Sequence, residues 1–350
     1  MKSKKNNSNM NRREFNKSLI TLAAGAPFFS SGELFSETLT KSEKSDRRNE
    51  RSTMTYRKLG LTNFMCSRLV FGCGAALVGG KAVHLLDRAF ESGINYFDCG
   101  SETYYKGNET SFAPFLKANR KDIWVTSKAM VDDSDDSQLD IPIKLDQAKA
   151  ASEKWTKLLD QSLKALQTEY VDAYLLMNIR NPSFITSEEV YRAFLDAKSA
   201  GKVGHFGFST HKNAKKVLEA AIKTGWHQIA MIGITPAGWY DWSTKDIEKD
   251  APSLSSLQSL LNKARDSGIG LIGMKTVRLM APLSSLGKGD ETVFNGYCGK
   301  KLMESPLNPF QRAYAYILEN GLDVVNADMQ NYTHLEENIV AAATSRKYFK

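Results

Sequence analysis

Residues 91–98, Glu91-Ser92-Gly93-Ile94-Asn95-Tyr96-Phe97-Asp98, join the end of one helix-like segment to a short apolar strand. The segment before them, 81–92, carries apolar residues on one stripe at helical spacing. The strand, 95–99, has the aromatic residues Tyr96 and Phe97 at its centre, and Asp98 stands near its carboxyl end. A helix followed by a strand with both faces apolar is typical of a sheet covered on both sides.

The same alternation recurs along the chain and predicts eight strands. The strand-like runs are 69–72, 95–99, 123–128, 171–177, 205–210, 228–234, 270–275 and 324–329. The amphipathic segments between and after them are 81–92, 145–167, 187–199, 212–224, 253–267, 308–319 and 333–344. Strands that alternate with helices are parallel and joined by right-handed crossovers. Eight such units predict an α/β fold of the (β/α)8 TIM barrel type. The alternative, a doubly wound open sheet, is disfavoured because no GxGxxG follows the first strand.

Two further segments are predicted to flank the barrel. Residues 56–66 contain a Leu59-Gly60 turn between strand-forming residues, which predicts a β-hairpin at the barrel bottom. The stretch 276–307, between the seventh strand and its helix, is too long for an ordinary connection. We expect it to lie over the active-site face as a loop or lid.

The first residues predict an export signal. Arg12 and Arg13 precede an apolar run, 19–29, which is too short to span a bilayer. We interpret residues 1–32 as a twin-arginine signal peptide, 33–55 as a solvated polar linker, and 56–350 as the barrel. This predicts a periplasmic or secreted protein that is recognised by the twin-arginine export machinery and has no stable membrane insertion.

The charge and the cysteines exclude other classes of protein. The net charge is +8, but residues 1–30 hold six positive side chains and one negative one, so they supply +5 of it. The remainder is only slightly basic, which gives no reason to predict nucleic-acid binding. The four cysteines, at 66, 73, 99 and 298, form no CxxC pair and no cluster with metal-ligand spacing, so we predict no metal site and no disulfide scaffold.

Polar residues at strand ends mark a candidate catalytic site, because active sites of such barrels lie at the carboxyl ends of the strands. Asp98 ends the second strand, Lys128 ends the third, and Tyr104 and Tyr105 follow Asp98 in the next loop. An ammonium lowers the pKa of a nearby tyrosine, and a carboxylate fixes the ammonium. Such a set can donate a proton to a carbonyl oxygen. The alternative is that Asp98 and Lys128 form a purely structural ion pair and that the loop tyrosine only packs against its neighbours.

Four motifs in order resemble the aldo-keto reductase family, from about Tyr56 to Ala343. They are Tyr56-Arg57-Lys58-Leu59-Gly60, the stretch 91–98 quoted above, Gly201-Lys202-Val203-Gly204-His205-Phe206-Gly207-Phe208-Ser209, and Leu335-Glu336-Glu337-Asn338. The resemblance implies a (β/α)8 barrel that passes a hydride between NADP or NAD and a small carbonyl or hydroxyl compound, for example a sugar-like one. It implies that Asp98, Lys128 and a tyrosine are catalytic. Tyr104 is the first choice as proton donor and Tyr105 the second.

The resemblance also implies a cofactor site. Ser209 matches the serine that holds the nicotinamide amide, and Glu337 and Asn338 match the adenine contacts. Lys275 and Arg278, after the seventh strand, suit a pyrophosphate. Trp239 or Tyr240 could stack on the nicotinamide, because Ile234 stands where the family has an aromatic ring.

Two positions depart from the family pattern. Met177 stands where the family has its catalytic histidine. His334 stands where an arginine is expected, which predicts weaker recognition of the 2′-phosphate than in the family at large. Asn178 is adjacent to Met177 and could replace the histidine, whereas His211 is a weaker candidate. The alternative function is therefore a non-catalytic exported barrel that binds a ligand or partner.

Overall fold

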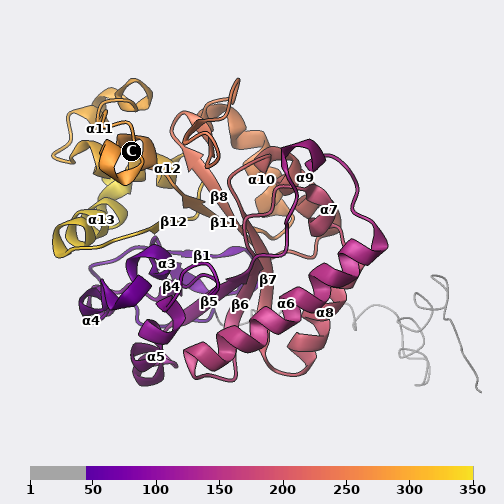
Figure 1. Ribbon diagram of the computed structural model, residues 1–350. Coiled ribbons are helices and arrows are strands. Elements are labelled where there is room, and N and C mark those ends of the chain that lie inside the picture. Colours follow the sequence, from indigo (N-terminus) through magenta and orange to yellow (C-terminus); the bar gives the residue numbers. More distant parts are fainter. Residues whose placement is uncertain (1–44, 350) are drawn as a thin grey trace, which may run out of the picture. The chain divides into compact units, whose positions relative to one another are not determined.

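The computed structural model describes residues 45–349, and in it eight parallel strands close into a barrel (Figure 1). The barrel is closed by pairing of the fifth and sixth strands, in which Gly207 lies opposite Ile229. The predicted (β/α)8 architecture is confirmed. The strands are β3 (Leu69–Gly72), β4 (Tyr96–Asp98), β5 (Trp124–Ala129), β6 (Val171–Leu176), β7 (Val203–Thr210), β8 (Ile229–Thr235), β11 (Gly270–Met274) and β12 (Val324–Ala327).

Helices surround the barrel, and Figure 1 shows α6 and α8 side by side along one flank. The helices are α3 (Cys73–Ala76), α4 (Leu86–Glu91), α5 (Asn108–Asn119), α6 (Leu145–Leu166), α7 (Pro182–Ile185), α8 (Glu188–Ser199), α9 (Ala214–Thr224), α10 (Gln258–Asp266), α11 (Lys300–Met303), α12 (Pro309–Glu319) and α13 (Tyr332–Thr344). Within the described part of the chain, no helix has the length and apolar character needed to cross a membrane.

The predicted hairpin lies at the bottom of the barrel. Strands β1 (Tyr56–Lys58) and β2 (Met65–Ser67) pair antiparallel, and Gly60 turns the chain between them with φ +51°. A Cβ at Gly60 would lie 2.4 Å from the carbonyl oxygen of Gly268. Because no side chain fits there, glycine at this position lets the hairpin seal the barrel.

Residues 45–55 differ from the solvated linker that we predicted for 33–55. Arg48 forms an ion pair of 2.9 Å with buried Asp172, and Asn95 donates a hydrogen bond to the Arg48 carbonyl. The Asn49 amide donates to the carbonyls of Phe90 and Ile94. The polar composition that indicated a linker instead satisfies buried polar groups under the barrel. The rest of the predicted linker and the predicted signal, residues 1–44, lie outside the described residues.

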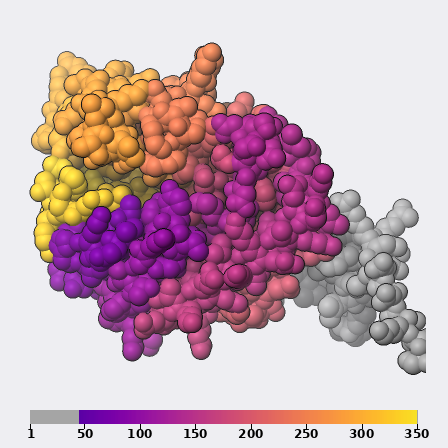
Figure 2. All heavy atoms as spheres, in the orientation of Figure 1, coloured from indigo at the N-terminus to yellow at the C-terminus, as the bar shows by residue number. Residues whose placement is uncertain are grey.

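Two segments extend the opposite face, where the strands have their carboxyl ends. A hairpin of β9 (Gly238–Asp241) and β10 (Asp246–Ile247) follows β8, which the sequence analysis did not predict. The long segment 276–307 follows β11, as predicted, and contains short 3-10 turns and α11. Lys288 in this segment makes an ion pair with Asp246 of the hairpin. Figure 2 shows the surface hollowed between the orange residues of this segment and the indigo residues of the first βα units.

Candidate active site

Asp98 and Lys128 form a buried ion pair at the carboxyl ends of β4 and β5. Their side chains lie 2.5 Å apart, from Lys128 Nζ to Asp98 Oδ1, and Lys128 also donates to the Cys99 carbonyl at 2.7 Å. The strands place them side by side because β4 and β5 pair in parallel, with Asp98 opposite Thr126. The structure therefore brings together two of the three predicted catalytic residues.

A third residue, Asn326 on β12, completes this arrangement. Its amide donates to Asp98 Oδ2 at 2.6 Å and lies 3.4 Å from Met231 Sδ. Burial raises the pKa of Asp98, while the Lys128 ammonium and the Asn326 amide oppose that rise. Both carboxylate oxygens thus have a donor, which stabilises the ionised form. An asparagine inside an apolar strand carries no signal of its own, so the role of Asn326 could not be predicted from the sequence.

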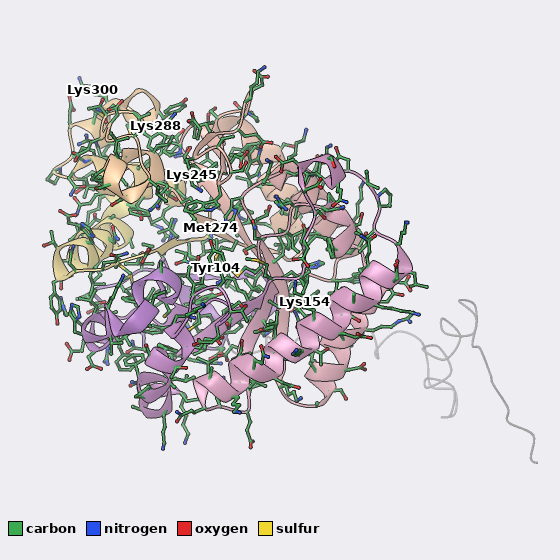
Figure 3. All side chains as sticks on the ribbon, in the orientation of Figure 1. Tyr104, Lys154, Lys245, Met274, Lys288 and Lys300 are labelled. Carbon is green, nitrogen blue, oxygen red and sulfur yellow. The ribbon has the colours of Figure 1, made fainter. Side chains whose placement is uncertain are left out.

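The two loop tyrosines occupy different environments. Tyr104, the predicted donor, is 52% exposed (Figure 3). The Tyr105 ring is half-buried against Gly100, where an added Cβ would lie 2.4 Å from ring carbon Cδ2. Burial raises the pKa of Tyr105. The nearby Tyr104, Asp328 and Asp98 raise this pKa further, whereas Arg278 lowers it. Tyr105 is therefore within electrostatic range of Asp98. Within residues 45–349, neither hydroxyl is hydrogen-bonded to Lys128.

The position of the family histidine is occupied by a buried methionine. Met177 lies directly after β6 and is 7% exposed. The strand has ended at Leu176, and Asn178 turns the chain with φ +55°. The backbone N–H of Asn178 donates to Ser209 Oγ at 3.0 Å. Because the strand has ended, alternation along the strand no longer decides where the Asn178 side chain lies.

His211 follows β7, at the carboxyl ends of the barrel strands (the barrel mouth), but it is not a cation there. Burial lowers the pKa of His211 to about 3, and Lys275, Lys245 and Arg180 lower it in the same direction. Its ring centroid is 6.1 Å from that of Trp242. The imidazole is therefore neutral near pH 7 and can only act as a neutral donor or acceptor.

The predicted cofactor residues come from three elements. Ser209 on β7 is buried, and its hydroxyl proton remains available because Oγ accepts the Asn178 N–H. Glu337 and Asn338 lie in the first turns of α13, where Asn331 caps the helix by accepting from the His334 N–H. Lys275 and Arg278 follow β11. β7, the segment after β11 and helix α13 are all parts of the barrel. The barrel therefore fixes how far these three groups of residues lie from one another.

Three cations surround Trp242, a residue that was not predicted to belong to the site. The Trp242 ring centroid lies 3.3 Å from Lys245 Nζ, 4.5 Å from Lys275 Nζ and 5.3 Å from Arg278 Cζ. By contrast, Trp239 and Tyr240, the rings that we expected to stack on a nicotinamide, are 2% and 1% exposed and belong to the core. Trp242 is half-buried, and its ring faces charged groups.

A buried carboxyl underlies the loop that carries the tyrosines. Glu109, in the first turn of α5, lies 2.5 Å from the Ser127 hydroxyl through Oε1, and Oε2 has no hydrogen-bond partner. Burial raises the pKa of Glu109 to about 7, although the hydrogen bond from Ser127 and the positive charge of Lys128 oppose the rise. The side chain is therefore partly protonated near neutral pH.

This shift predicts a pH-dependent stability. Because the pKa of Glu109 is raised on folding, its contribution to stability is full below about pH 4.5 and is lost as the pH rises through 7. The loss amounts to about 3 kcal/mol. Glu109→Gln should remove this dependence, so that the variant becomes the more stable protein at pH 8. Urea unfolding at pH 5 and pH 8 measures it, with exposed Glu153→Gln on α6 as the control. An unchanged pH dependence in Glu109→Gln would show that Glu109 is ionised in the folded protein.

Comparison with known proteins agrees with the fold and with the Asp98–Lys128 ion pair. The model of the aldo/keto reductase family matches residues 71–279, more than half of the chain. The chain belongs to the aldo/keto reductase family. It is 31% identical over 161 residues to the uncharacterized oxidoreductase YqkF of Bacillus subtilis, an overlap of 45% of this chain and 49% of that protein. The chain thus spans about half the length of this curated relative.

Solved structures share the fold at low sequence identity. Aldo-keto reductase AKR11C1 from Bacillus halodurans, in its holo form, superposes with a TM-score of 0.59 at 19% identity and covers 84% of this chain and 95% of its own. The thermostable aldo-keto reductase Tm1743, in complex with the inhibitor epalrestat, gives 0.56 at 21% identity and covers 82% and 94%. These likenesses show the (β/α)8 fold.

Proposed function

We propose that the protein is an oxidoreductase that transfers a hydride between NADP or NAD and a small carbonyl or hydroxyl compound, for example a sugar-like one. The observation that carries the proposal is the buried Asp98–Lys128 pair at the carboxyl ends of the strands, with a tyrosine within electrostatic range. Family membership supports the reaction type. A bound nicotinamide dinucleotide would supply or accept the hydride.

The chain's own residues would handle the proton. We assign proton donation to Tyr105 rather than Tyr104, because Tyr105 is packed at the mouth and Tyr104 is half exposed. Its pKa is raised by burial, in contrast to the lowering by an ammonium that the sequence predicted, and the phenol is protonated at neutral pH. An alkoxide that develops at the substrate oxygen is a stronger base than a phenolate, so the proton moves from Tyr105 to that oxygen. Lys128, held by Asp98, adds positive charge at the mouth.

The residues present fit a dinucleotide. Lys275 and Arg278 form no ion pair among the described residues, and the buried Nε of Arg278 has no hydrogen-bond partner. A pyrophosphate would satisfy such groups. The Ser209 hydroxyl can donate to a carboxamide oxygen, and Glu337 and Asn338 could contact an adenine. The segment 276–307 could slow release of the nucleotide by closing over it.

A direct test is whether nucleotide binds. We expect a nicotinamide dinucleotide to co-purify with the protein, to be detected by mass spectrometry after denaturation, and to be lost from Lys275→Ala/Arg278→Ala. With His334 in place of the family arginine, discrimination between NADP and NAD should be weak. If no nucleotide is found and calorimetry detects no binding of added NADPH or NADH, the oxidoreductase proposal fails.

We further propose export by the twin-arginine machinery, which carries folded proteins. The proposal rests on Arg12 and Arg13 ahead of the apolar run 19–29. Changing both arginines to lysine keeps the charge but removes the pair, so the variant should stay in the cytoplasm while the unchanged protein reaches the periplasm. Cell fractionation measures this. Arrival of the double-lysine variant in the periplasm by the same route would refute the signal.

A further inference from the structure

The Tyr105 ring rests on two glycines from neighbouring βα units. A Cβ added at Gly100, two residues after β4, would lie 2.4 Å from ring carbon Cδ2 and 2.7 Å from Cε2. A Cβ added at Gly74, in α3, would lie 3.1 Å from Cε2 and 3.3 Å from Cζ, the carbon that carries the hydroxyl. Helix α3 contacts both β4 and α5 (Figure 1). The ring therefore packs against main chain at a place that only glycine leaves open.

Asn108, the first residue of α5, closes the loop that carries this ring. Its side-chain oxygen accepts the Gly100 N–H at 3.1 Å, and its amide nitrogen donates to the Gly100 carbonyl at 3.0 Å. The same nitrogen donates to the Tyr105 carbonyl at 2.7 Å. Asn108 is fully buried, so water does not compete for these bonds. One side chain thus ties together the two ends of the 100–105 segment.

This bonding pattern requires the amide of asparagine. Both N–H donors and the oxygen acceptor of Asn108 are used, and an ionised aspartate of the same shape could only accept. The pattern is not needed to begin the helix, because the Glu102 carboxylate already accepts the N–H groups of Gly107 and Glu109 at the start of α5. The bonds of the Asn108 side chain therefore serve the loop rather than the helix.

The closed segment begins next to the buried ion pair. Lys128 Nζ donates to the Cys99 carbonyl at 2.7 Å, and Gly100 is the next residue along the chain. Within the segment, the Tyr105 N–H donates to the Ser101 carbonyl at 2.8 Å. Lys128 therefore holds the chain just before the segment, and Asn108 joins its two ends. A reacting group needs such a fixed geometry to act efficiently.

We propose that Asn108 positions Tyr105 for proton donation by closing the 100–105 segment, while Gly74 and Gly100 set the orientation of the ring. The inference rests on the proposed function, which assigns the donor role to Tyr105. Asn108 and the two glycines act through the tyrosine, so they are positioning residues. Their effect on the reaction should therefore disappear when the Tyr105 hydroxyl is absent.

Two variants of the full chain test the inference by their kinetics. Asn108→Asp keeps the shape but loses both donated bonds, and it should lower kcat about 10²-fold, the cost of misplacing a reacting group by about 1 Å. Gly74→Ala presses one methyl on the ring, and alanine fits the backbone because the φ of Gly74 is not positive. It should lower kcat about tenfold. KM should change less than about twofold in both, because the groups that bind the ligands are unchanged.

The control and the combined variants separate positioning from a general loss of structure. Asn119→Asp makes the same change at the other end of α5, where the Asn119 amide donates to the Phe115 carbonyl, and its kcat should match wild type. Neither Asn108→Asp nor Gly74→Ala should lower the residual kcat of Tyr105→Phe. Equal losses in the wild-type and Tyr105→Phe backgrounds would overturn the inference, and so would wild-type kcat in both variants.

A measurement without substrate distinguishes this inference from the proposed function. In protein with ¹³C-labelled tyrosine, the Tyr105 ring signals are those that Tyr105→Phe lacks. A ring packed on main chain along one edge should give separate signals for its two edges, and Asn108→Asp should merge them by allowing faster ring flips. If this occurs in a protein that reduces no carbonyl compound with NADPH, the positioning stands and the oxidoreductase function fails. If Tyr105→Phe abolishes turnover but Asn108→Asp changes neither the ring signals nor kcat, the function stands and the inference fails.

Discussion

Replacing Tyr105 with phenylalanine is expected to lower turnover about 10²–10⁴-fold, the usual cost of losing a positioned general acid. The change removes one hydroxyl and keeps the ring that packs on Gly100. Tyr104→Phe is the matched variant, because it makes the same chemical change one residue away at a side chain that is 52% exposed. Its effect should be mild. The rate of NADPH oxidation with a panel of small aldehydes and ketones measures both.

The outcomes separate the two tyrosines clearly. A large loss in Tyr104→Phe with a mild effect in Tyr105→Phe would return the donor role to Tyr104, the residue predicted from the sequence. If the wild-type protein turns over a substrate and both variants match it, neither tyrosine donates the proton. Unfolding of each variant in urea shows whether a lost rate reflects lost structure.

Removing one partner of the Asp98–Lys128 pair should strongly destabilise the protein. Lys128→Met leaves the Asp98 carboxylate buried without its cation, which costs about 3–5 kcal/mol of unfolding free energy. Asp98→Asn combined with Lys128→Met removes both charges and should recover much of that loss. Urea unfolding of the two single variants and the double variant gives the coupling energy directly.

An exposed pair provides the control for this cycle. Lys154 and Asp133 make an ion pair of 2.9 Å on the surface, where both side chains are more than a third exposed (Figure 3). Lys154→Met should cost no more than about 1 kcal/mol, because solvent screens such pairs. If Lys128→Met costs as little as Lys154→Met, Asp98 is either protonated or solvated in the folded protein, and the ion pair does not organise the site.

The strands were predictable because each is a short apolar run with both faces buried. β3 has the predicted bounds, and the others differ from the predicted runs by at most two residues at either end. Helix α5 was not among the predicted segments. Its buried face has helical spacing, but the first two buried residues, Asn108 and Glu109, are polar and Pro114 lies inside the helix, so apolar periodicity did not predict it.

The site was predictable only where charge falls at a strand end. Asp98 and Lys128 meet that condition, and the structure pairs them. Asn326 lies inside a strand, and its role depends on a contact across the barrel with a residue 228 positions away. Trp242 lies in the β9–β10 hairpin, which no periodic pattern in the sequence predicted. The choice between Tyr104 and Tyr105 depends on loop packing, which spacing along the chain does not specify.

The polar residues 45–55 beneath the barrel determine where the chain can be truncated. A polypeptide that starts at Tyr56, where the apolar pattern begins, would retain every barrel strand but lose Arg48 and Asn49. Asp172 would then keep Arg120 alone as its cationic partner, and the carbonyls of Phe90 and Ile94 would lose the amide that caps them. The smallest autonomous folding unit therefore includes this polar stretch, so truncation boundaries for this fold are better chosen from buried pairings than from hydropathy.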